Sequence, residues 1–175
     1  MHFHVYLYMN ISSKTKLYAV LPTERYLKKF LATKTNIEPD YLLSNKDKFG
    51  SFVYVCLRNP EYKVELNEKR FNEKIKIIIP LSYEKNGKCE LNNEAIHLIN
   101  NFLKNWFYED FIRYMTLTSM FNIRMDKSIL SFCMNYDIEI DIDIQYETLK
   151  KQYYRWRQHH GEPVNKYILE LVQES

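Results

Sequence analysis

The feature that most constrains this chain is a segment near its C-terminal end, residues 126–160, where apolar spacing, charge and aromatic content coincide. Within it, residues 145–158 have large apolar side chains at offsets of three, seven and ten, which places them on one side of a 3.6-residue repeat. The four residues are Tyr146, Leu149, Tyr153 and Trp156. The pattern predicts a helix that buries this side, preceded by a shorter helix over residues 128–134.

The other sides of the predicted helix are basic. An Arg guanidinium pairs in bidentate fashion with phosphate or guanine edges, whereas Lys acts as a point charge on phosphate. We therefore expect this surface to bind nucleic acid, and the alternative is a packed helix whose basic side is only solvated. The candidate residues are Lys150, Lys151, Tyr154, Arg155, Arg157 and Gln158.

Between the two predicted helices, acids alternate with isoleucines over residues 137–143. Strict alternation suits a half-buried strand, and an extended connector fits equally well. Asp141 and Asp143 would stabilise the N-terminus of the second helix by about 0.3 to 1 kcal/mol each if they fall in its first turn. Because carboxylates repel phosphate, a DNA-reading surface should lie on the middle and end of that helix.

The succession of a short helix, a connector and a helix with the sequence LKKQYYRWR resembles the helix-turn-helix ends of small proteins from bacterial phages and plasmids. It covers about a fifth of the chain and points to no specific family. The resemblance implies a duplex DNA partner and a regulatory or replication-associated role on a mobile genetic element.

The first part of the chain predicts strands and one amphipathic helix. Strands are expected over residues 3–9 and 15–21, and Pro22 would take the first helical position. The following helix carries an apolar stripe of Tyr26, Leu27, Phe30 and Leu31. Its outer residues Arg25, Lys28 and Lys29 form a second candidate basic patch.

Further strands are predicted over residues 51–58 and 75–81, the latter buried on both faces until Pro80 places it at an edge or an end. Asn86-Gly87 is a hairpin signal. After Leu91 the pattern becomes helical, with a cap at Asn92 or Asn93 and a wide apolar face to about residue 115, central to a core or a dimer interface.

These elements predict an α+β fold, with a small mainly antiparallel sheet and one or two helices in residues 1–91, and helices in residues 92–175. No Pro/Gly-rich linker separates the two parts, so we expect one continuous domain. A last short helix is expected after Pro163.

The net charge of +3 over 175 residues is too small to indicate a nucleic-acid partner by itself. Its distribution is uneven: residues 1–80 hold 14 basic and 8 acidic side chains, and residues 81–143 hold 6 and 10. Such asymmetry suits a polyanion, or two copies of the chain pairing opposite patches as a homodimer or protein-interaction module.

Several classes of site are excluded. Cys56, Cys89 and Cys133 lack any C-x-x-C spacing, which argues against a disulfide framework or a zinc site and fits a reducing cytoplasm. No apolar run reaches the ~18 residues of a membrane span. The chain has no phosphate-binding glycine loop, nucleophile signature or dinucleotide motif. We therefore expect no enzyme, no cofactor and no bound metal.

One minor alternative is catalytic. His2 and His4 on one side of a strand, with Tyr26 three residues before Lys29, resemble motifs of relaxases and rolling-circle nucleases. In those families the histidines hold a divalent metal and the tyrosine attacks a phosphodiester. Tyr26 also lies on the apolar stripe of its helix, which favours an ordinary core tyrosine.

Overall fold

The computed structural model describes residues 17–35, 40–57, 71–80 and 91–160. The chain divides into two compact units, Met1–Lys104 and Asn105–Ser175, and the division falls inside helix α4 (Asn93–Met120). The predicted α+β class, with a helical C-terminal half, is confirmed. The strand predicted over residues 3–9, the Asn86-Gly87 turn and the last helix lie outside the described residues.

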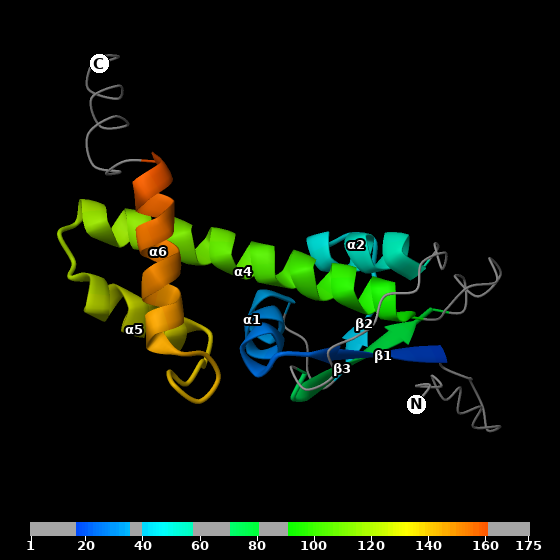
Figure 1. Ribbon diagram of the computed structural model, residues 1–175. Coiled ribbons are helices and arrows are strands. Elements are labelled where there is room, and N and C mark those ends of the chain that lie inside the picture. The colour runs from blue at the N-terminus through cyan, green and yellow to red at the C-terminus, as the bar shows by residue number, and fades with distance from the viewer. Residues whose placement is uncertain (1–16, 36–39, 58–70, 81–90, 161–175) are drawn as a thin grey trace, which may run out of the picture. The chain divides into compact units, whose positions relative to one another are not determined.

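The first unit contains a three-stranded sheet with the order β1-β3-β2 (Figure 1). Strands β1 (Leu17–Thr23) and β3 (Glu73–Ile79) are antiparallel along their whole length, whereas β2 (Tyr41–Leu42) joins β3 in parallel. The sheet is therefore mixed, and its antiparallel pair is much the longer.

Strand β3 ends at Ile79, directly before Pro80. A proline has no backbone N–H to donate to a neighbouring strand, so the pairing stops there. Strand β3 is nevertheless the central strand and not an edge. Its burial alternates: Ile75, Ile77 and Ile79 are buried, Lys74 and Lys76 are exposed, and Ile78 is half-buried. The prediction that both faces are buried was wrong, because side chains of a strand alternate between faces and only one face here meets the core.

Helix α1 (Arg25–Thr35) buries the predicted apolar stripe of four residues. The helix begins after Thr23, and Pro22 lies in β1 instead of opening the helix. A proline fits there because β1 is an edge strand of the described sheet.

Helix α2 (Lys48–Leu57) occupies the segment predicted as a strand over residues 51–58, so that prediction was wrong. The segment is rich in β-branched and aromatic residues, which favour strands. Packing overrides this weak strand propensity. The buried residues Phe49, Val53, Cys56 and Leu57 have helical spacing. Asp47 caps the helix, because its Oδ1 accepts the Gly50 N–H at 2.8 Å.

Helix α4 begins where an asparagine cap was predicted, with Asn92 Oδ1 accepting the Ala95 N–H at 2.8 Å. Within the first unit, the buried Asn100 joins α4 to the end of β1. Its Oδ1 accepts the Thr23 hydroxyl at 2.7 Å, and its amide donates to the Pro22 carbonyl at 2.9 Å. These bonds leave the amide satisfied in the core.

The second unit comprises the rest of α4 with α5 (Met125–Asn135) and α6 (Tyr146–His160). Phe132 of α5 is its aromatic centre, with ring centroids 5.5 Å from Phe107 and 5.1 Å from Phe111 in edge-to-face geometry. All three rings are fully buried. Of the helices described, none is both long and apolar enough to cross a membrane.

The connector from α5 to α6 is built from turns and contains one isolated bridge, Ile140 to Ile144. Helix α5 ends in a Schellman motif: Ile138 N–H donates to the Cys133 carbonyl at 2.9 Å, and Asp137 has a φ of 53°. Ile138 is buried, whereas Asp137 is exposed. Of the two readings that the alternation allowed, the continuous half-buried strand was wrong.

Candidate nucleic-acid interface

Helix α6 is anchored in its unit by two of the four residues predicted to hold it. Leu149 is fully buried and Tyr153 is 3% exposed. Tyr146 and Trp156 are half-buried, so the packed side is narrower than the apolar spacing predicted. Because one side of α6 is packed against its unit, the polar side chains on the opposite side point to solvent.

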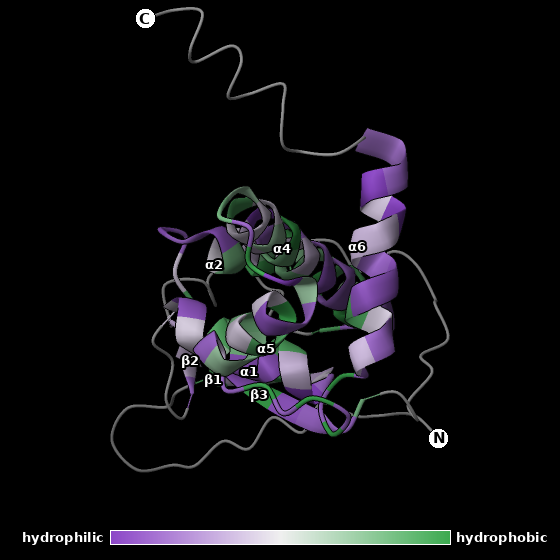
Figure 2. Ribbon diagram, turned by 90° about the vertical axis from the view of Figure 1, so that its left-hand side faces the viewer, coloured by the Kyte–Doolittle hydropathy of each residue, from purple (hydrophilic) through white to green (hydrophobic). Residues whose placement is uncertain are grey.

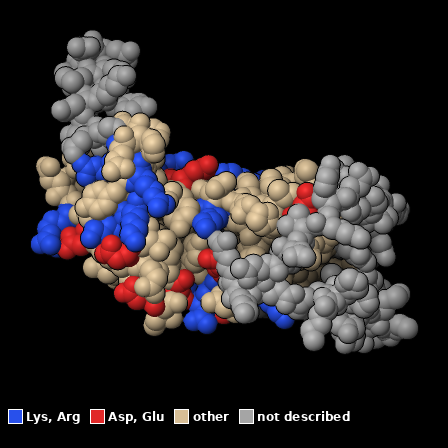
Figure 3. Space-filling view, viewed as in Figure 1, with Lys and Arg blue, Asp and Glu red and all other residues tan. Residues whose placement is uncertain are grey.

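The outward face of α6 consists of Lys151, Tyr154, Arg155 and Gln158, which follow the i, i+3, i+4, i+7 spacing of one helix side. All four are exposed. Figure 2 shows α6 mainly in hydrophilic colour, and Figure 3 shows Lys and Arg atoms gathered over this helix. Four of the predicted contact residues therefore share one accessible surface.

The two cations of the outward face are not ion-paired within the described part of the chain, where no carboxylate lies within 4.0 Å of Lys151 or Arg155. The two flanking cations are engaged. Lys150 lies 3.4 Å from Glu147 and 5.9 Å from the Tyr146 ring centroid. Arg157 lies 5.9 Å from the Tyr153 ring centroid.

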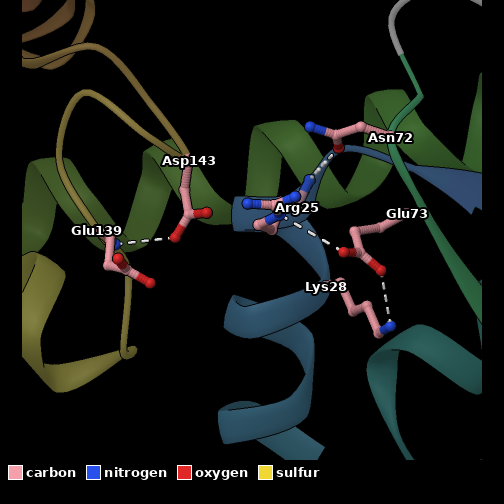
Figure 4. A network of polar contacts seen from close by, with 6 residues as sticks. All are labelled: Arg25, Lys28, Asn72, Glu73, Glu139 and Asp143. Atoms are coloured by element: carbon pink, nitrogen blue, oxygen red, sulfur yellow. Dashed lines mark hydrogen bonds and ion pairs between the residues drawn. The ribbon is translucent and has the colours of Figure 1, made fainter.

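Two carboxylates of the connector lie near the N-terminal end of α6, where Glu147 also stands in the first turn of the helix. Asp141 Oδ1 accepts the Tyr146 N–H at 3.1 Å in the first turn of α6, and Asp143 Oδ2 accepts the Glu139 N–H at 2.8 Å (Figure 4). Both acids thus have structural partners, and Asp141 stabilises the positive end of the helix dipole. The N-terminal end of α6 is acidic and the rest of its exposed surface is basic.

In the second predicted patch, on α1 in the other unit, two of the three cations are ion-paired with one carboxylate. Glu73 accepts from Lys28 Nζ at 3.0 Å and lies 3.4 Å from Arg25 Nε (Figure 4). The hydrogen bond from Lys28, with the charges of both cations, lowers the pKa of Glu73. Lys29 is half-buried on the same helix and has interactions of its own. This patch is consequently weaker as an anion site than its sequence suggested.

The described cysteines and Tyr26, the tyrosine of the minor catalytic alternative, are buried. Burial raises the pKa of the thiols of Cys56 and Cys133 to about 11, so little thiolate exists at neutral pH. Tyr26 is 3% exposed, as expected of a core tyrosine. In the described ranges, no three His, Cys, Asp or Glu side chains form a metal-ligating group. His2 and His4 lie outside those ranges.

His160 was not among the predicted site residues, and in the structure it contacts an aromatic residue of α6. Its ring stacks on Trp156, with centroids 5.0 Å apart and planes 13° from parallel. The i, i+4 spacing of the two rings was the available signal.

No family model, curated protein or solved structure matches this chain.

Proposed function

We propose that this chain binds double-stranded DNA through the outward face of α6. Lys151 and Arg155 contact phosphates, with Arg155 also able to reach a guanine edge, while Tyr154 and Gln158 contact sugar or base. Lys150 and Arg157 add positive charge at the flanks of the same face. Arg25, Lys28 and Lys29 belong to this proposal only as a secondary surface.

The proposal is best supported by Lys151 and Arg155, two exposed cations without an ion pair among the described residues, on a helix whose opposite side buries Leu149 and Tyr153. Such cations retain their full charge, and binding phosphate does not require an internal ion pair to break. Phosphate contacts of this kind supply most of the affinity of proteins for generic duplex DNA.

The acidic connector determines which part of the helix faces the DNA. Asp141 and Asp143 lie at the N-terminal end of α6, and they repel phosphate. The duplex therefore approaches the middle and C-terminal end of α6, in contrast to the N-terminal docking of common recognition helices. In this proposal the chain is a non-enzymatic cytoplasmic protein with the mobile-element role that the helix-turn-helix resemblance implies.

Fluorescence anisotropy with a labelled blunt duplex at fixed low salt tests the proposal. Lys151→Ala and Arg155→Ala should each weaken binding by about tenfold, the loss expected for one charge-assisted contact. Lys127→Ala and Arg113→Ala are matched controls, because each removes an exposed cation of the same type from another helix of the same unit. Equal losses in all four variants would contradict a binding surface on α6.

A second candidate function is self-association, which a different set of side chains favours. The aromatics Phe107 and Phe111 of α4 are buried, so they are not available for a dimer contact. Further along the second unit, large apolar side chains are exposed instead: Leu117, Phe121, Leu130 and Met134. Leu130 and Met134 are four residues apart on α5 and so adjoin on one side of that helix, and adjoining exposed apolar side chains favour a protein contact.

Sedimentation equilibrium separates this candidate from DNA binding. A dimer held by these side chains would form as concentration rises and would be lost in Phe121→Ser, the substitution of a side chain that is 77% exposed. A chain that stays monomeric and binds duplex would exclude this candidate and leave the DNA proposal.

A further inference from the structure

Three aromatic rings of α6 form a continuous stack along the helix, here called the aromatic stack. Tyr153 and Trp156 have centroids 6.2 Å apart and planes 10° from parallel. The Trp156 ring in turn stacks on His160 at 5.0 Å. Trp156 is therefore covered on both faces, whereas the described residues place no further ring against His160.

His160 is held in this orientation by a hydrogen bond as well as by stacking. Its Nδ1 lies 3.0 Å from the Trp156 carbonyl oxygen. A carbonyl oxygen can only accept, so Nδ1 carries the proton. The residue is exposed at the last position of α6. An exposed, pre-oriented ring loses little conformational freedom when another flat group stacks on it.

The last turn of α6 is favourable to a nucleic acid on every side. Its residues are Arg157, Gln158, His159 and His160, with no carboxylate among them. A strand that leaves the outward face toward this end of the helix therefore meets no acidic side chain of α6 on its path.

We propose that the exposed face of the His160 ring, against which the described residues place no ring, is a stacking site for an unpaired nucleobase. The proposal rests on the proposed function, because the cations of the outward face bring the nucleic acid to this end of the helix. Stacking on an aromatic ring accepts any base and requires that the base be unpaired. The preferred ligand is then a duplex with a single-stranded extension.

The position of His160 sets a minimum length for that extension. His160 follows Lys151 by nine residues, about two and a half turns at 3.6 residues per turn, so it lies on the opposite side of the helix axis. A helix with side chains is about 10–12 Å wide. A strand has to pass around the helix, a path of about 16–19 Å, which four nucleotides reach only when they are drawn out beyond the stacked spacing of about 3.4 Å.

The test compares a blunt duplex with the same duplex carrying overhangs of one and four nucleotides, of either polarity, by fluorescence anisotropy. The four-nucleotide overhang should bind about tenfold more tightly than the blunt duplex, and the one-nucleotide overhang should not. His160→Ala should abolish the preference and leave blunt-duplex affinity unchanged. His160→Tyr, which keeps a flat ring, should restore it.

His159→Ala is the matched control, because it removes the neighbouring exposed imidazole, which makes no ring contact in the described structure. It should keep the preference. Trp156 supplies an independent readout: in a Trp106→Phe background, its fluorescence should change on adding the four-nucleotide overhang but not the blunt duplex.

The outcomes separate this inference from the proposed function. Equal binding of all three duplexes, or a preference that survives His160→Ala, would overturn the stacking site while leaving duplex binding intact. Binding to the four-nucleotide overhang that His160→Ala abolishes, with no binding to the blunt duplex, would support the stacking site and overturn the duplex proposal. No binding to any of these nucleic acids would overturn both.

Discussion

At the scale of single residues, Gly50 shows how little room the first unit leaves. A Cβ at this position would lie 1.9 Å from the Ser44 carbonyl oxygen and 2.4 Å from the Tyr41 hydroxyl oxygen. That hydroxyl donates to Asp47, the residue that caps α2. Burial and the bond to Asp47 raise the pKa of Tyr41, which keeps the phenol protonated.

Gly50→Ala should therefore destabilise the protein by about 1–3 kcal/mol, the usual cost of overpacking, because backbone and a bonded hydroxyl would both have to move. Urea unfolding followed by circular dichroism measures the change. Val55→Ala on the same helix, where the side chain is 64% exposed, should change stability by less than about 0.5 kcal/mol. A tolerated Gly50→Ala would contradict the close approach of the chain at this point.

Glu73 gives a second residue-scale prediction, on pH. Its pKa is lowered in the folded state, so the stabilisation is complete above the ordinary value of 4.5 and is lost as pH falls through the lower folded value. Glu73→Gln should cost about 0.2–1 kcal/mol at neutral pH, since the ion pairs are partly exposed. Urea unfolding of both proteins across acidic pH should show the difference shrinking, and a difference that grows toward low pH would oppose this assignment.

At the scale of elements, the predictable parts are those whose periodicity and packing agree. Helices α1, α4 and α6 were each predicted from an apolar stripe; the bounds of α6 were close, whereas α1 begins three residues later and α4 ends five residues later than predicted. Helix α2 was mistaken for a strand because the window began at Ser51, after the buried Phe49 that completes the helical spacing. The two-residue strand β2 is too short to show alternating burial in the sequence. It is defined only by its pairing with β3.

The candidate site was predictable where it depends on spacing within one helix. Sequence spacing identified the outward face of α6, because a helix side depends only on residue order. It could not show that Arg25 and Lys28 meet Glu73, 45 or more positions away along the chain. Tertiary ion pairs of this kind depend on strand and helix placement, which spacing does not encode.

Adjacent tyrosines on α6 allow packing and binding to be separated. Tyr153 is 3% exposed and Tyr154 is 43% exposed. Tyr153→Ala should lower the free energy of unfolding by about 3 kcal/mol, as loss of a buried aromatic does. Tyr154→Ala should leave stability within about 0.5 kcal/mol and weaken duplex binding. Thermal unfolding and anisotropy on both variants measure this, and a reversed order would contradict the orientation of α6.

At the scale of the whole molecule, the change in sequence character and the division of the structure fall at different places. The sequence pattern becomes helical after Leu91, yet the first turns of α4 pack with β1 and α2, since Asn100 bonds to Thr23 and the Phe102 ring stacks on Phe52 at 4.3 Å. The two compact units therefore divide inside α4, after Lys104. Because α4 continues across this division, no linker marks it in the sequence.

The salt dependence of duplex binding tests the central claim most directly. The logarithm of the association constant should fall linearly with the logarithm of salt concentration, and the double variant Lys151→Ala/Arg155→Ala should flatten the slope by about 1.8, or ~0.9 for each lost phosphate contact. Lys127→Ala should leave the slope of the unmodified protein unchanged. An identical slope in the double variant would show that DNA is bound elsewhere, or not through these cations at all.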